Sequence, residues 1–169
     1  MLRVALFVED VVEDIEFLYP YYRFLEEGYE VDVISQDKKK VHGKKGGTFE
    51  AKKSIDDVVS SDYDLLFIPG GYAPDKLRTN KKITDFVKEM DKSKKLIGAI
   101  CHGPWVLVSA GVCKGRELTS FPSIKDDITN AGGVHTEKPV TVDKNIITAT
   151  DPSAMPEMFQ EIIKALKKA

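Results

Sequence analysis

The residue best suited to chemistry in this sequence is Cys101, which lies in the segment GAICHGP. An apolar stretch precedes the cysteine, Gly103 follows two residues later, and a helical pattern begins directly afterwards. This order is typical of a nucleophile elbow, the sharp strand-to-helix turn that presents a nucleophile at the edge of a sheet. Ala99 stands where serine hydrolases place glycine, and alanine is small enough for a crowded turn. We therefore predict that Cys101 carries the chemistry.

A position just before a helix favours an ionised thiol, because the helix dipole and free backbone N–H groups stabilise thiolate. Cys101 is then expected to react near neutral pH. The alternative is a buried, inert cysteine at a strand end, which is the commoner fate of cysteines. His102 is the candidate base, since imidazole titrates near pH 7. Because adjacent side chains usually point in different directions, a hydrogen bond from His102 to the backbone is an equal alternative.

Acidic residues follow the first predicted strand, and we expect them at the same sheet edge as the cysteine, where the carboxyl ends of parallel strands meet. Glu13 is the candidate to reach the thiol and share a proton with it. Asp14 and Glu16 suit the first turn of a helix, where acids complement the helix dipole, and Asp14 is interpreted as the cap.

Glycines mark two of the turns at this edge. Gly70 and Gly71 follow a predicted strand, and their N–H groups, with the N–H after the cysteine, are suited to an oxyanion pocket that Gly103 also lines. The alternative, a tight turn that needs positive φ, is compatible with this role. No phosphate-loop or dinucleotide motif is present. His42 and His135 lack Cys or acidic partners at ligand spacing, so no metal site is predicted.

Short apolar runs alternate with helical patterns along the chain. Runs that are apolar on both faces are typical of strands buried between two helix layers, so we predict a doubly wound, mainly parallel sheet. The predicted strands are Val4–Val8, Val31–Ile34, Leu65–Ile68, Leu96–Ile100 and Ile146–Ala149. Helices are predicted from Asp14, where Ile15, Leu18, Tyr22 and Leu25 form one apolar stripe, and over 81–90, 103–110 and 156–166. The polar segment 37–53 is predicted to form a hairpin.

Composition narrows the class of protein. The 169 residues suit one domain, and the 25 basic and 27 acidic side chains nearly cancel, with no basic face that would indicate nucleic-acid binding. No signal peptide or membrane span is evident, so we expect a cytoplasmic protein with no membrane partner. Cys101 and Cys113 are then reduced thiols, and Cys113 is interpreted as incidental.

The sequence resembles the archaeal intracellular protease (PfpI) branch of the ThiJ/PfpI superfamily in three stretches, VEDIEFLYPYYRFLEEGYEV, LLFIPGGYAPDKLR and AICHGPWVLVSAGVCKGRELTSFPSIKDDITNAGG. The resemblance covers nearly the whole chain. It implies one class I glutamine amidotransferase-like domain over residues 1–169, a flavodoxin-like sandwich, no cofactor, and assembly into dimers, trimers or hexamers.

Specific site residues are implied by the same resemblance. Cys101 matches the nucleophile of the family, His102 its neighbouring histidine, and Glu13 the acid that contacts the cysteine. In the protease branch an acid from the adjacent subunit orients the histidine, and Asp75 matches it, one carbon shorter than the Glu found there. Thr150 stands where relatives tend to carry Arg, so the substrate preference need not follow theirs.

Three functions are compatible with these residues. The leading hypothesis is a cysteine hydrolase of the intracellular protease type, which acts on peptides through a Cys101 thiolate and an oxyanion pocket. The first alternative is a cofactor-independent glyoxalase or deglycase that acts on methylglyoxal, a small carbonyl compound, or on its adducts. The second is a stress-sensing protein whose oxidisable Cys101 forms a sulfinate stabilised by a nearby carboxyl.

Overall fold

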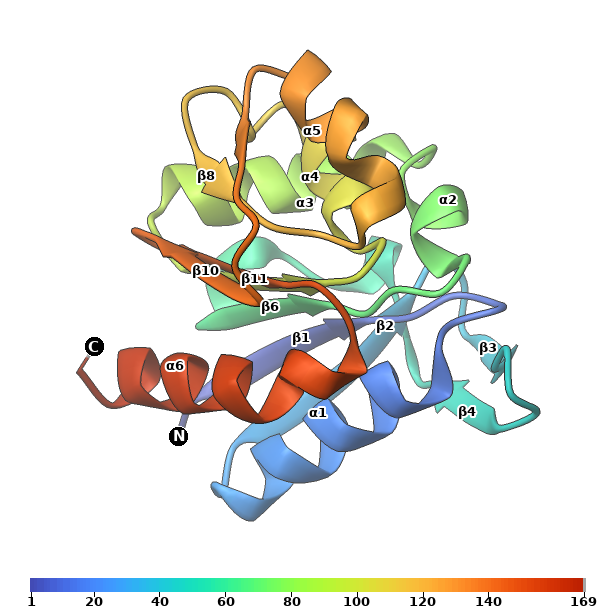
Figure 1. Ribbon diagram of the computed structural model, residues 1–169. Coiled ribbons are helices and arrows are strands. Elements are labelled where there is room, and N and C mark those ends of the chain that lie inside the picture. The colour runs from blue at the N-terminus through green and yellow to red at the C-terminus, as the bar shows by residue number, and fades with distance from the viewer. Residues whose placement is uncertain (169) are drawn as a thin grey trace.

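One central sheet of seven strands organises the chain in the computed structural model, which describes residues 1–168 (Figure 1). Its order is β10-β11-β7-β6-β1-β2-β5, and every neighbouring pair is parallel except β10 with β11. The strands are β1 (Arg3–Phe7), β2 (Glu30–Ser35), β5 (Lys53–Ser54), β6 (Leu65–Ile68), β7 (Leu96–Ile100), β10 (Val140–Asp143) and β11 (Ile146–Ala149). The predicted doubly wound, mainly parallel sheet is confirmed.

Helices cover both faces of this sheet (Figure 1). One layer contains α1 (Asp14–Glu26) and α6 (Met155–Lys168), and the other contains α2 (Ala73–Leu77), α3 (Lys81–Lys92), α4 (Pro104–Ala110) and α5 (Lys125–Asn130). Successive strand residues point to opposite faces. In β6, Leu65 and Phe67 therefore join the core under α1 and α6, whereas Leu66 and Ile68 join the core under α3 and α4. Both cores need apolar residues at every strand position, which explains the continuous apolar runs.

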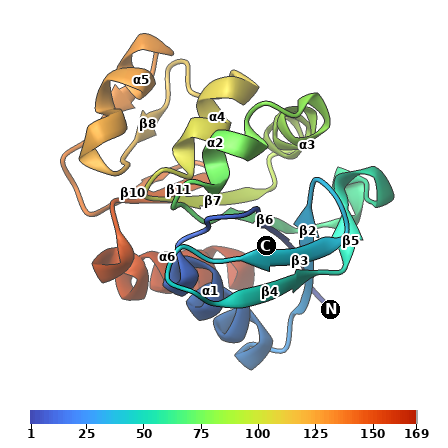
Figure 2. The same cartoon turned by 90° about the vertical axis from the view of Figure 1, so that its right-hand side faces the viewer.

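Two small two-stranded sheets, one antiparallel and one parallel, lie outside the main sheet. The predicted hairpin in segment 37–53 is confirmed as β3 (Lys39–His42) paired with β4 (Thr48–Ala51), and Figure 2 shows it beside the sheet near α1. The other ladder pairs β8 (Glu117–Leu118) with β9 (Val134–His135) in parallel. This second ladder and the short helices α2 and α5 were not predicted.

Most of the apolar stripe used to place α1 faces away from the core, and only one member, Leu18, is half-buried and packs against it. Ile15, Tyr22 and Leu25 are 46%, 62% and 43% exposed. The buried face of the helix contains Glu16 together with Phe17, Pro20 and Phe24. Residues 16, 20 and 24 share one side of a helix, roughly opposite the stripe. The helix is therefore predicted correctly in extent but turned about its axis, and this difference decides which acid reaches the site.

Candidate active site

Cys101 occupies the sharp turn between β7 and α4. Its φ of 61° lies in the left-handed region, which non-glycine residues adopt rarely. The turn is closed by a 2.7 Å hydrogen bond from the Gly103 N–H to the Ile100 carbonyl. A Cβ atom on Gly103 would lie 2.5 Å from the Ile68 carbonyl oxygen, so only glycine fits there. The strand, strained turn and helix have the arrangement of a nucleophile elbow.

Some backbone N–H groups near the sulfur already donate hydrogen bonds elsewhere in the chain, and others do not. The N–H groups of His102 and Gly71 are directed at the Cys101 thiol. The Gly70 N–H instead donates to Glu16 Oε1 at 2.8 Å, and the Gly103 N–H is used within the turn. The expectation that the Gly70 N–H is an oxyanion donor is corrected on this ground, because it already has a partner, and Gly103 does not line the pocket as expected. Gly71 and His102 carry the donors that are left.

Glu16 is the carboxyl that lies against Cys101, in place of the predicted Glu13. It is fully buried, its Oε1 atom accepts the Gly70 N–H, and its Oε2 atom has no hydrogen-bond partner among residues 1–168. Burial, together with the charge of Glu13, raises its pKa to about 8, against the opposing effect of the Gly70 N–H. Glu16 is therefore protonated at neutral pH and able to donate to sulfur. The correction follows from the rotation of α1, which turns position 16 toward the sheet.

Glu13 lies in the same pocket but immediately before α1. It is the N-cap residue by position, and its side chain makes no capping hydrogen bond. Its Oε2 atom is buried and has no hydrogen-bond partner among residues 1–168. Glu13 therefore offers a carboxylate oxygen to a ligand in the pocket, while Glu16 contacts the nucleophile.

Asp14 does not cap α1, contrary to expectation. Its carboxylate accepts hydrogen bonds from the N–H groups of Lys45 and Gly47, at 2.8 and 2.7 Å. These bonds hold the loop of the β3–β4 hairpin against the start of α1. The adjacent Lys44 is thereby placed at the rim of the Cys101 pocket, with its Nζ atom 5.2 Å from the centre of the Tyr72 ring.

His102 is oriented toward the thiol by the left-handed turn. Its Nδ1 atom lies 3.3 Å from Cys101 Sγ, and its Nε2 atom lies 3.2 Å from Ser123 Oγ. The ring stacks on Phe121, with centroids 5.0 Å apart, and meets the edge of Trp105. Burial, and to a smaller degree Lys44, lowers the pKa of His102, so the imidazole is neutral at pH 7 and can accept a proton. Hydrogen bonding of His102 to backbone is not what the structure shows.

Ser123 was missed by sequence reasoning. It lies in the 3-10 turn Pro122–Ile124 that precedes α5, twenty-two residues after the nucleophile, and its hydroxyl contacts the outer nitrogen of His102 within the same chain. A single serine in a short turn carries no signal of this role in the sequence. The predicted partner Asp75 is exposed on α2 and does not line the pocket of its own chain.

The thiol is held in its protonated form more strongly than predicted. Burial, followed by the charge on Glu16, raises the pKa of Cys101 to about 12, and the N–H groups of His102 and Gly71 offset only part of this increase. The expectation of free thiolate near neutral pH is therefore wrong for this chain. Sulfur can become nucleophilic by passing its proton to His102 Nδ1. Cys113, fully buried in the core, also has a pKa raised by burial to about 12.

The pocket above Cys101 has a volume of about 400 Å³. It opens where β1, β6 and β7 end, and Cys101 at its floor is only 8% exposed. The side chains and glycine that line it are Glu13, Glu16, Lys44, Gly71, Tyr72, Cys101, His102, Phe121, Ser123, Asp151 and Pro152. Thr150, where relatives were expected to carry Arg, does not line it, but the neighbouring Asp151 does. Charged groups of both signs thus surround a small, mostly enclosed site.

Two negative observations concern the described part of the chain. Among residues 1–168, no three His, Cys, Asp or Glu side chains are grouped so that they could hold a metal ion. No helix in that range is both long and apolar enough to span a bilayer.

Comparison with known proteins places these features in a family. The model of the DJ-1/PfpI family matches residues 2–165. A deglycase of Pyrococcus abyssi is 40% identical over 166 residues, which cover 98% of this chain and 100% of that protein. YraA of Bacillus subtilis is 39% identical over 166 residues, which cover 98% of this chain and 98% of that protein. Its name assigns it provisionally as a cysteine protease.

A solved structure agrees with this assignment. A two-domain protein of Anabaena variabilis, with DJ-1/ThiJ/PfpI-like and ferritin-like domains, superposes with a TM-score of 0.97 at 34% identity. The match covers 99% of this chain and 48% of that one, so the present chain spans about half of the larger protein. Sequence and structure lead to the same assignment: the chain belongs to the DJ-1/PfpI family.

Proposed function

We propose that this protein is a cysteine-dependent enzyme that acts, without a cofactor, on small α-oxoaldehydes such as methylglyoxal and on their adducts with amines and thiols. One observation carries the proposal: Cys101 Sγ lies on the floor of a pocket of about 400 Å³, 3.3 Å from a neutral imidazole nitrogen. Relatives named deglycases, such as that of Pyrococcus abyssi, support this substrate class.

The chemistry begins with addition of sulfur to the aldehyde carbon. A C–S bond forms while the thiol proton passes to His102 Nδ1, and the N–H groups of His102 and Gly71 stabilise the negative charge that develops. When the substrate is an amine adduct, the C–N bond breaks and the amine leaves with a proton. The sulfur-bound product is a hemithioacetal in either case.

The second stage is an internal redox step. A proton moves from the sulfur-bearing carbon to the neighbouring keto carbon through an enediol, so the first carbon is oxidised to a thioester and the second is reduced to an alcohol. His102, neutral again once its proton has passed to the hemithioacetal oxygen, is the base placed to take this proton and return it to the second carbon. Glu16, protonated at neutral pH and lying against the thiol, donates a proton to the keto oxygen as the enediol forms and regains one as the thioester forms. Water then cleaves the thioester, which releases lactate and restores the thiol. No external oxidant or reductant is needed.

Peptide hydrolysis is the second candidate, and the provisional protease name of YraA favours it. It requires the same thiol, base and N–H donors. An extended peptide must, however, bring its scissile carbonyl to a cysteine that is only 8% exposed. A small carbonyl compound reaches that depth more easily, and this difference ranks the two candidates.

Product analysis separates the candidates. We expect the protein to release lactate from methylglyoxal and from methylglyoxal-treated N-acetylarginine, measured by proton NMR, and to leave fluorescein-labelled casein intact. Casein fragments without lactate would replace the proposal with the protease. Peroxide-dependent addition of two oxygens to the Cys101 peptide, with neither product formed, would favour the stress-sensing alternative.

Self-assembly belongs to this proposal as well. The exposed stripe of Ile15, Tyr22 and Leu25 on α1 is an apolar surface of the kind that a second copy covers. Asp75 is exposed on α2. Figure 2 shows α2 in the same layer as α4, the helix that begins two residues after His102. We propose that Asp75 of a neighbouring copy approaches His102. The imidazole would then have a charged hydrogen-bond partner in addition to the neutral hydroxyl of Ser123.

Variants at the two partners of His102 distinguish their roles. Ser123→Ala removes one neutral hydrogen bond, worth about 1 kcal/mol, so kcat should fall about fivefold at any enzyme concentration. Asp75→Asn should lower kcat only at concentrations where the oligomer forms, as followed by light scattering. Ser61→Ala, a change at an exposed serine outside the pocket, is the matched control. An Asp75→Asn protein with full activity as an oligomer excludes the neighbouring acid.

A further inference from the structure

A hollow of about 810 Å³ lies at the amino ends of the parallel strands, on the sheet edge opposite Cys101. Its volume is about twice that of the Cys101 pocket. Leu2 precedes β1, Asp64 precedes β6, Leu96 begins β7, and Asn145 precedes β11, so the hollow crosses the middle of the sheet. None of the residues assigned to the reaction lines it, and the hollow has no part in the proposed function.

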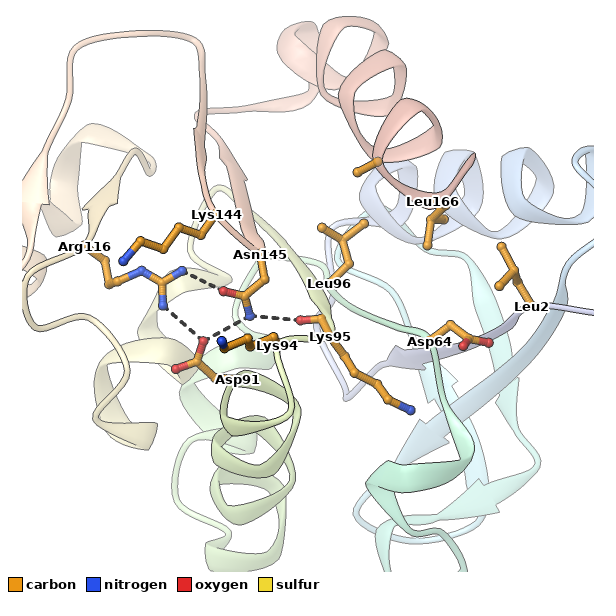
Figure 3. A pocket seen from close by; sticks show the side chains of 11 residues that line it. Leu2, Asp64, Asp91, Lys94, Lys95, Leu96, Arg116, Lys144, Asn145 and Leu166 are labelled. Atoms are coloured by element: carbon orange, nitrogen blue, oxygen red, sulfur yellow. Dashed lines mark hydrogen bonds and ion pairs between the residues drawn. The ribbon is translucent and has the colours of Figure 1, made fainter. Parts of the chain in front are cut away.

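The hollow has a polar end and an apolar end (Figure 3). Leu2, Leu96 and Leu166 form the apolar end, and Arg116 and Asn145 lie at the other. A ligand that is apolar throughout, or polar throughout, would leave one of these ends without matching contacts. The lining is therefore suited to a molecule with two chemically different ends.

Arg116 is largely unavailable to a ligand, because four of the five N–H groups of its guanidinium already have partners. It donates to Asp91 Oδ1 at 3.1 Å, to Asn145 Oδ1 at 2.8 Å, and to the side chain and carbonyl of Asp143 at 3.3 and 2.9 Å. Lys95 is also satisfied, since its Nζ atom donates to the carbonyls of Ser61 and Tyr63. Arg116 and Lys95 therefore stabilise the wall of the hollow and are not its ligand-binding groups.

Lys94 and Lys144 are the two cations of this hollow that remain unused. Neither side chain makes a hydrogen bond or ion pair with any residue between 1 and 168, and both line the hollow near Arg116 (Figure 3). Both residues have left-handed backbone, with φ of 57° and 55°. Glycine or asparagine would fit such turns with less strain, so the backbone itself gives no reason for a lysine at either position.

We propose that this hollow binds an amphipathic anion, a carboxylate or phosphate head on an unbranched apolar body. Lys94 and Lys144 hold the head by charge-assisted hydrogen bonds, and the body lies along Leu2, Leu96 and Leu166. Asp64 lines the apolar end and disfavours a second negative charge there, which fixes the direction in which the ligand enters. Binding at this edge stabilises the folded chain without occupying the catalytic pocket.

Calorimetry with octanoate and with octyl phosphate tests the proposal. We expect at least one of the two to bind the intact protein with 1:1 stoichiometry, and the tighter of the two identifies the head group. The double substitution Lys94→Asn, Lys144→Asn should weaken that binding about tenfold or more, since it removes two charged donors. Asparagine tolerates left-handed backbone, so the variant keeps its fold.

Three comparisons make the result decisive. Lys52→Asn with Lys138→Asn, an equal loss of charge at exposed lysines outside the hollow, should leave binding unchanged. Cys101→Ala should also leave it unchanged, which separates this site from the proposed enzyme activity. Failure of both probes, equal binding by the Lys94 and Lys144 variant, or binding of inorganic phosphate as tight as that of octyl phosphate would overturn the proposal.

Discussion

Replacing Cys101 with alanine should lower kcat/KM for lactate formation by about 10³-fold or more, because no other thiol lines the pocket to form the thioester intermediate. His102 and the N–H donors would remain but would have no nucleophile to activate. The substitution removes one sulfur atom at a turn whose hydrogen bonds are made by the backbone, so the fold should survive. Activity is measured by lactate release and folding by circular dichroism.

Cys113→Ala is the matched control. This second thiol is fully buried in the core beneath α3 and α4, remote from the pocket lining. Its loss creates a small cavity and should cost on the order of 1 kcal/mol of stability, while kcat/KM stays near that of the parent protein. The nucleophile is misassigned if Cys101→Ala remains active while the folded Cys113→Ala variant does not.

Much of the fold was predictable because buried parallel strands have an unmistakable composition. Leu65–Ile68, Leu96–Ile100 and Ile146–Ala149 have the predicted bounds, since each strand must be apolar toward both cores. The turn at Cys101 was predictable for a similar reason, as only small residues fit around it. Two-residue strands such as Glu117–Leu118 have no periodicity to detect and were therefore not predicted.

The carboxyl partner of the thiol was not predictable, because the sequence does not show which face of α1 is turned toward the sheet. The stripe that contains Ile15 and Tyr22 has the spacing of a core-facing surface, and a core-facing stripe would turn Glu16 away from the sheet. The stripe is exposed instead, and Glu16 shares the buried face with Phe17. An apolar stripe that stays exposed has the same spacing in the sequence as one that faces the core.

The second large effect expected is a dependence of activity on pH, which comes from the ionisation of Glu16. Its pKa is raised to about 8, chiefly by burial, so it is neutral below that pH and becomes a carboxylate above it. The carboxylate repels negative charge on sulfur and on the substrate oxygen. Lactate formation should therefore fall above pH 8 by about tenfold per pH unit, the slope of a single proton. At low pH, activity is lost when His102, whose pKa is lowered, becomes protonated.

The free energy of unfolding should also depend on the protonation of Glu16. Between the ordinary pKa of 4.5 and about 8, the folded chain keeps a proton on Glu16 that the unfolded chain has released. The free energy of unfolding therefore loses up to about 1.4 kcal/mol per pH unit over this range through this group, and the loss ends above pH 8. Glu16→Gln should remove this contribution, as measured by urea unfolding at pH 5, 7 and 9.

Glu16→Gln should also abolish the alkaline fall in activity, because glutamine cannot ionise. Its amide can still donate a hydrogen bond, but it cannot give up a proton to the substrate oxygen, so kcat below pH 8 should decrease as well. Glu13→Gln is the matched control, the same chemical change at another carboxyl that lines the pocket, and it should keep the alkaline limb. If Glu13→Gln removes that limb and Glu16→Gln retains it, the roles are exchanged and the acid implied by family resemblance is the one that governs the thiol. Loss of the limb in Glu16→Gln alone ties the pH dependence to the carboxyl that the rotation of α1 places against Cys101.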